Sequence, residues 1–137
     1  MAEAQPDLLR QAAAWLAAAG AIGALGVVAG ALGAHGLESR LGPRALEQWR
    51  LAAHYQLLHA PVLAAASLWL RAGGRASPWV RAACWLLAAG IGMFSGSLYL
   101  LASSGIRALA WTTPVGGLSL VAGWACLAAA GVIGLRR

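Results

Sequence analysis

The sequence predicts an all-α polytopic membrane protein, a single domain over residues 1–137 built as a bundle of four transmembrane helices. Hydrophobic residues make up 61% of the chain and charged residues only 10%, against about 25% charged residues in an ordinary soluble domain. Charge-free windows occur four times, and each is long enough to cross the hydrocarbon, which takes about 20 helical residues. The alternating pattern of a transmembrane β-barrel is absent.

The residues between these windows set the predicted helix boundaries. Gly36 and the polar segment 38–40 end the first helix, and Pro43 suits the first turn of the second because its missing N–H costs nothing there. Residues 72–78, with two glycines and a proline, separate the second helix from the third, and residues 103–105 (Ser-Ser-Gly) form the last turn. Helices are therefore predicted over residues 11–35, 44–71, 79–103 and 108–135.

The charge distribution predicts lipid contact and an orientation. The net charge is +6 and every basic residue is arginine. The arginines lie between the apolar windows rather than on one face, which argues against nucleic-acid binding and favours anchoring at lipid headgroups. The side of the two termini carries Arg10, Arg71, Arg75, Arg81, Arg136 and Arg137. The other side carries Arg40, Arg44, Arg50 and Arg107. This excess predicts that both termini are cytoplasmic.

Tryptophans and small residues predict how the helices sit and pack. The tryptophans expected at headgroup level, near helix ends, are Trp15, Trp49, Trp69, Trp79, Trp85 and Trp111. Trp124 lies deeper and is expected to pack between helices. Small residues allow membrane helices to approach closely, within one bundle or in a homodimer. The glycines expected to serve this packing are Gly26, Gly30, Gly33, Gly92, Gly96, Gly116 and Gly117.

Polar side chains inside the predicted spans define a candidate site. Tyr55, Gln56 and His59 are expected to form one stripe of the second helix, and Ser95 and Tyr99 share a face of the third. In an up-down bundle these groups fall in the half of the membrane away from the termini. The candidate residues are His35, Tyr55, Gln56, His59, Ser95, Ser97, Tyr99 and Thr113.

Three interpretations of this cluster are open. The side chains could satisfy each other across helices and fix the register of the bundle. They could form a solute or proton site around the titratable His59. They could bind a metal or haem through His35 and His59, with or without His54. The last is disfavoured because His54 and His59 lie about 140° apart around a helix, and no His and carboxylate pair has the spacing of a helical zinc site.

Four motifs in order along the chain resemble one known family. They are residues 30–35 (GALGAH), Tyr55-Gln56 with His59, residues 94–99 (FSGSLY), and residues 113–117 (TPVGG) followed by Gly123-Trp124. Together they resemble the YgdD-like membrane proteins, grouped under domain of unknown function 423 and similar to eukaryotic transmembrane protein 256. The resemblance implies a four-helix bundle in the bacterial inner membrane. It marks His35, Tyr55, Gln56, His59, Ser95, Gly96, Ser97, Tyr99, Thr113, Pro114, Gly116 and Gly117 as motif positions.

The expected function is that of a non-enzymatic accessory or scaffold protein, because no nucleophile lies beside an obvious base. The alternative is a small-solute or proton-handling protein that uses His59, Tyr55 and Gln56. The expected partners are the lipid bilayer and either further copies of the chain or a larger membrane complex. No cofactor or metal and no nucleic acid is expected.

Overall fold

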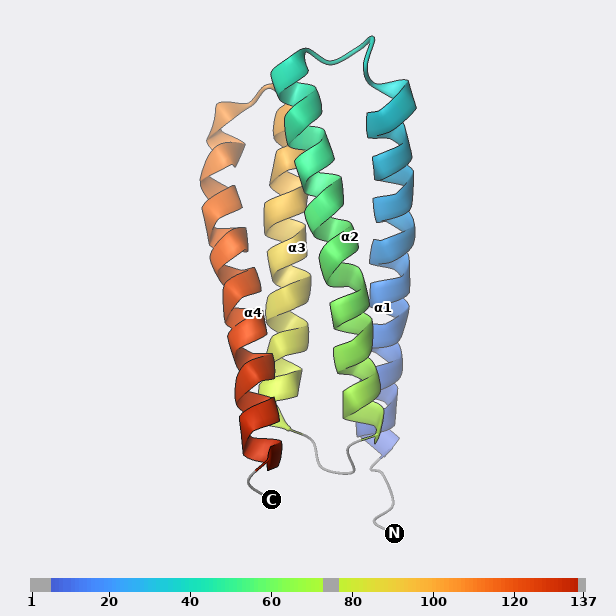
Figure 1. Ribbon diagram of the computed structural model, residues 1–137, viewed down its shortest axis with the longest axis vertical. Coiled ribbons are helices and arrows are strands. Elements are labelled where there is room, and N and C mark those ends of the chain that lie inside the picture. Colours follow the sequence, from blue (N-terminus) through green and yellow to red (C-terminus); the bar gives the residue numbers. More distant parts are fainter. Residues whose placement is uncertain (1–5, 73–76, 136–137) are drawn as a thin grey trace.

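The computed structural model describes residues 6–72 and 77–135 and contains an antiparallel bundle of four long helices (Figure 1). The elements are α1 (Pro6–Ala31), its π-helical continuation η1 (Leu32–Gly36), α2 (Pro43–Ala72), α3 (Pro78–Ser104), the 3-10 helix η2 (Arg107–Trp111) and α4 (Thr112–Leu135). The expected all-α four-helix architecture is confirmed.

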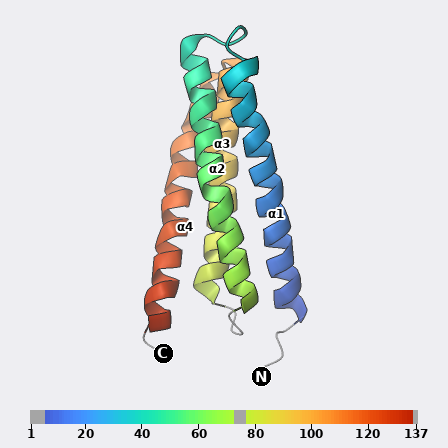
Figure 2. The ribbon, with the colours of Figure 1, turned by 45° about the vertical axis from the view of Figure 1, so that its right-hand side comes forward.

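The two ends of the bundle are named by what lies at them. We call the end where α1 begins and α4 ends the terminal end, and the opposite end, which carries residues 37–42 and 105–111, the loop end (Figures 1 and 2). Arg75, Arg136 and Arg137, which contribute to the predicted orientation, lie outside the described residues.

Local sequence explains where the helices depart from their predicted bounds. α1 begins at Pro6 rather than at residue 11, because proline fits the first helical turn and Asp7 is favourable near a helix N-terminus. Gly105, at φ 70°, ends α3 in the left-handed conformation and donates its N–H to Leu101 O at 2.9 Å. The following residues form a 3-10 turn, so α4 starts at Thr112 rather than at residue 108.

Three helices of the described chain are long and apolar enough to span a membrane. They are Pro6–Gly36, Pro78–Ser104 and Arg107–Leu135, with hydropathies of 1.9, 1.6 and 2.0. α2 is more polar but has 30 residues, and it runs from the loop end to the terminal end between spanning neighbours. The chain can pass from the end of α1 to the start of α3 only if α2 also crosses, so the bundle has four crossings.

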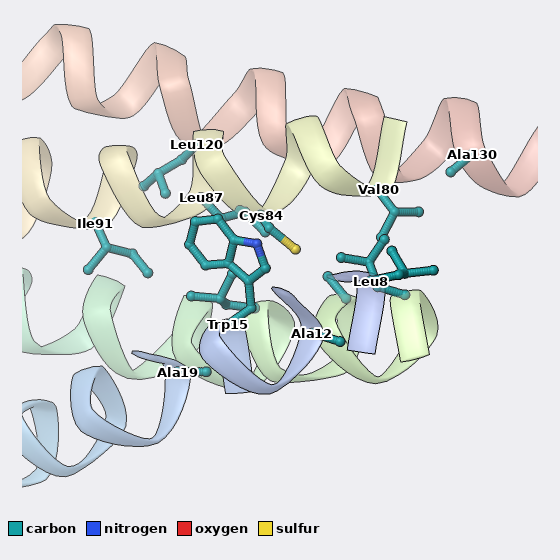
Figure 3. Close-up of a cluster of buried hydrophobic side chains, with 13 residues drawn as sticks. Leu8, Ala12, Trp15, Ala19, Val80, Cys84, Leu87, Ile91, Leu120 and Ala130 are labelled. Carbon is teal, nitrogen blue, oxygen red and sulfur yellow. The ribbon is translucent and has the colours of Figure 1, made fainter. Parts of the chain in front are cut away.

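Packing follows chain order, with α1 against α2, α2 against α3 and α3 against α4. A cluster of buried apolar side chains fills the half of the bundle near the terminal end, where Trp15 of α1 reaches toward Cys84 and Leu87 of α3 (Figure 3). The Trp15 ring meets Trp85 edge-on, with centroids 4.7 Å apart. Trp15 is therefore a core residue of the bundle.

Glycines set the closest helix contact, between α3 and α4. A Cβ at Gly116 would overlap the backbone nitrogen of Phe94, and it would lie 2.9 Å from the carbonyl carbon of Met93. A Cβ at Gly123 would lie 2.9 Å from Leu87, and one at Gly90 would lie 2.7 Å from Leu120. Gly90 is absent from the glycines selected by sequence. At Gly116 the two helix backbones approach each other directly, and at Gly90 and Gly123 the backbone of one helix packs against a leucine of the other.

We predict that Gly116→Ala destabilises the bundle, because the new methyl group meets the backbone of α3 rather than a movable side chain. Overpacking of this kind costs about 1–3 kcal/mol, which outweighs the gain in helix propensity. Gly131→Ala on the same helix is the matched control, since nothing lies within 4 Å of its Cβ. Unfolding in mild detergent, followed by tryptophan fluorescence, compares the two; equal stabilities would contradict the close contact.

Candidate functional site

Gln56 is a polar side chain within α2 that forms hydrogen bonds to two other helices. It is 7% exposed. Its Nε2 donates to Ile22 O of α1 at 2.7 Å, and its Oε1 accepts a hydrogen bond from the Tyr99 hydroxyl of α3 at 2.9 Å. One side chain of α2 therefore ties together three helices. Both functional atoms of the amide have protein partners, as hydrocarbon requires.

The π-helical end of α1 is bonded to α2 by two further side chains. Leu37 N–H donates to Leu32 O, five residues back, at 3.0 Å. Trp49 Nε1 donates to Ala29 O at 2.8 Å, and Arg50 Nε donates to Gly33 O at 3.0 Å. These bonds satisfy carbonyls around a widened helical turn.

Neither side chain was selected from the sequence. From its place near a span end, Trp49 was expected only to contact lipid headgroups. In the structure, Arg50 also forms a 2.7 Å ion pair with Glu38. A tryptophan and an arginine near a span end are also typical of side chains that anchor a helix at the membrane interface. No signal in the sequence therefore distinguished this anchoring from the hydrogen bonds that both side chains make to α1 and η1.

His59 belongs to a second, aromatic group. It is 8% exposed, and its Nδ1–H donates to Tyr55 O at 2.7 Å. The Tyr55 ring stacks on His59 with centroids 5.8 Å apart, and Phe94 lies 4.4 Å from Tyr55. The Trp124 ring of α4 meets His59 edge-on, with ring centroids 6.3 Å apart. Because a carbonyl can only accept, the Nδ1–H tautomer follows, and His59 Nε2 has no hydrogen bond to a described residue.

The expectation of one polar stripe on α2 is wrong. Gln56 faces α1 and α3, whereas Tyr55 and His59 meet Phe94 and Trp124. Consecutive helical residues lie about 100° apart, so Tyr55 and Gln56 necessarily point in different directions. The polar residues thus form two groups on different sides of α2.

The serines bond backbone and hydroxyl groups of neighbouring helices. Ser95, 1% exposed, donates to Ala52 O of α2 at 2.8 Å. Ser97 and Thr113 share a 2.7 Å hydrogen bond that joins α3 to α4. Ser119, which was not selected from the sequence, donates to Leu86 O at 2.8 Å. Each bond fixes the register of one helix pair.

The histidines do not converge. His35 lies exposed in η1 and His54 lies exposed on α2, whereas His59 is buried. Within residues 6–72 and 77–135, no three His, Cys, Asp or Glu side chains are grouped so that they could hold a metal ion.

A groove opens between α1 and α3 over the Gln56–Tyr99 pair. It has a volume of about 480 Å³, and its walls include Leu25 and Val28 of α1 and Leu32 of η1. On the α3 side it is lined by Gly92 and Gly96, where an added Cβ would have nothing within 4 Å. The expected packing of these two glycines against another helix is absent from the described chain.

The other selected glycines do have neighbours within the chain. A Cβ added at Gly26 or Gly30 would lie 3.0 Å or 3.8 Å from the Leu57 side chain. A Cβ added at Gly33 would lie 2.9 Å from Trp49, and one at Gly117 would lie 3.7 Å from Phe94.

A second apolar crevice, of about 410 Å³, lies between α2 and α4 and is lined by Pro61, Trp69 and Trp124 among others. Trp124 is 49% exposed, so it borders an open crevice. It meets His59 of α2 edge-on, so it lies between helices as expected but is not enclosed by them.

Comparison with known proteins confirms the family resemblance. Residues 29–117 match the family described as protein of unknown function (DUF423). A UPF0382 membrane protein of Staphylococcus haemolyticus is 43% identical over 103 residues, which cover 75% of this chain and 82% of the relative. The UPF0382 membrane protein YwdK of Bacillus subtilis is 40% identical, covering 82% and 92%. The UPF0382 inner membrane protein YgdD of Escherichia coli is 41% identical, covering 81% and 82%. No solved structure matches the chain.

We predict that Tyr99→Phe lowers the free energy of unfolding by about 0.5–1.5 kcal/mol, because it leaves Gln56 Oε1 buried without its donor. Tyr55→Phe is the matched control, since the Tyr55 hydroxyl makes no hydrogen bond with a described residue. Chemical unfolding in detergent measures both. Equal effects of the two changes would show that the Tyr99–Gln56 bond carries no stability.

Proposed function

The chain belongs to the DUF423 family as a multi-pass protein of the bacterial inner membrane, and we propose that it is a non-enzymatic accessory protein that docks a transmembrane helix of a partner in its α1/α3 groove. The observation that carries the proposal is the open pair Gly92 and Gly96. Their spacing is that of a helix-association motif, yet a Cβ added at either glycine would have no described residue within 4 Å.

The chemistry of the groove favours a helix over a solute. Its polar lining consists of Gln56, Ser95 and Tyr99, and these side chains already bond to the protein. Its walls are apolar and open, with Leu25 65% exposed and Val28 57% exposed. A bare glycine pair lets a helix backbone come close, and close packing is what drives association between helices in lipid.

A photo-crosslinking residue tests this docking in native membranes. Placed at Val28 in the groove, it is expected to yield a protein adduct. Placed at Val121, which is 66% exposed on α4, it is expected to yield only lipid. Gly92→Leu with Gly96→Leu fills the groove and is expected to abolish the Val28 adduct, because leucine side chains hold the partner backbone away. A Val28 probe that reacts only with lipid refutes the helix-docking proposal.

The adduct also identifies the partner class. A mass of twice the chain indicates a second copy, and any other protein mass indicates a larger complex. Gly131→Leu on α4, where the Cβ site is also open, controls for the general effect of adding leucines to the surface.

A second candidate function is proton or small-solute handling at His59. The observation that favours it is the Nε2 atom, which keeps some exposure at the edge of a largely buried side chain and has no hydrogen bond to a described residue. His59→Leu separates the two functions. The accessory function predicts an unchanged Val28 adduct and no change in proton flux across reconstituted vesicles. A flux that the wild-type protein supports and His59→Leu abolishes would favour proton handling.

We also propose that both termini are cytoplasmic, on the basis of the arginine excess at that side. A C-terminal alkaline phosphatase fusion, which is active only outside the cytoplasm, is expected to be inactive, and a green fluorescent protein fusion is expected to fluoresce. The opposite pair of results would reverse the orientation.

A further inference from the structure

A third hollow, of about 600 Å³, lies at the loop end between the start of α2 and the connection from α3 to α4. Arg44 and Gln48 of α2 and Arg107 of η2 are its polar lining, and Pro43 and Leu101 are among its apolar lining. It shares no lining residue with the α1/α3 groove, so it is independent of the proposed docking site. Its volume falls in the usual range for small-molecule pockets.

The charge in this hollow is not neutralised by the protein. Arg44 and Arg107 form no salt bridge with the described residues, and neither carboxylate of the loop end lines the hollow. Glu38 is engaged by Arg50 at 2.7 Å. The α1/α3 groove and the α2/α4 crevice, by contrast, contain no charged lining residue. Two guanidinium groups from different elements therefore share one concave site that attracts an anion.

Backbone geometry adds to this attraction. Pro43 opens α2, and Leu46 donates its N–H to Gly42 O at 3.0 Å. The first N–H groups of a helix have no acceptor within it and carry a partial positive charge. The start of α2 borders the hollow through Pro43, Arg44 and Ala45.

We propose that this hollow binds the phosphodiester headgroup of an anionic phospholipid, held by Arg44 and Arg107. Guanidinium groups bind phosphate oxygens in bidentate geometry. The hollow lies at the ends of membrane-spanning helices, the level at which headgroups lie. Leu101, Ala102 and Ala110 provide apolar surface beside the charges, which suits the glycerol and upper acyl carbons of a lipid better than a free phosphate.

The test uses the full-length protein, freed of bound lipid in mild detergent, and native mass spectrometry. The probes are phosphatidylglycerol and phosphatidylcholine with identical acyl chains. Wild-type protein is expected to bind phosphatidylglycerol more tightly. Arg44→Gln and Arg107→Gln are each expected to weaken that binding about fivefold, and the double variant roughly 25-fold, from the usual contribution of one arginine near an anionic lipid surface. Binding of phosphatidylcholine is expected to change little.

Arg40→Gln is the matched control, because Arg40 is exposed at the same end but does not line the hollow. It is expected to bind phosphatidylglycerol as the wild type does. The proposal is overturned if Arg40→Gln weakens binding as much as the double variant, since the effect would then be diffuse surface charge. It is also overturned if the double variant binds normally. Displacement of the lipid by equimolar sn-glycerol 3-phosphate would overturn the lipid in favour of a soluble phosphate ester.

Discussion

Within hydrocarbon a polar group has no water to bond, so a buried one needs a partner in the protein, and none of the buried side-chain nitrogen or oxygen atoms in the described residues lacks one. Gln56 meets this requirement by bonding Ile22 O of α1 and the Tyr99 hydroxyl of α3. Since membrane helices gain no hydrophobic drive from meeting each other, such bonds fix which faces meet and in what register. Ser95 on Ala52 and Ser97 with Thr113 apply the same constraint to the next two helix pairs.

Close approach between helices is supplied by residues without side chains. Gly116 and Gly123 bring α4 against α3, where Phe94 and Leu87 leave no room for a Cβ. Gly92 and Gly96 are chemically the same, but no described residue packs against them. The bundle therefore uses one set of glycines for its own assembly and leaves a second set bare. This difference is the basis for assigning the α1/α3 groove to a partner helix rather than to the fold.

The two ends of the molecule have different chemistry. The half near the terminal end holds the apolar cluster around Trp15, Cys84 and Leu87. The loop end holds the arginine-lined hollow. The Gln56 and His59 groups lie along α2 between them, on different sides of that helix. The proposed docking groove and the proposed anion site share no lining residue, so neither proposal depends on the other.

The sequence by itself determined the all-α class, the number of long helices and most of their limits. Length without charge and the positions of Pro43, Pro78 and Gly105 are local signals that need no neighbour to act. Several candidate residues, such as Gln56, Ser95 and Tyr99, also follow from sequence, because a polar group inside a span is costly wherever it points.

Only the tertiary structure decided which faces meet. It separated Gln56 from His59, buried Trp15, left Gly92 and Gly96 open and used Gly90 instead. It also assembled the arginine hollow from residues far apart in the chain. The physical reason is that these helices are apolar on nearly every side, so hydrophobic periodicity does not define an inward face. The rotation of each helix is set by packing and hydrogen bonds to its neighbours, which appear only when all four are assembled.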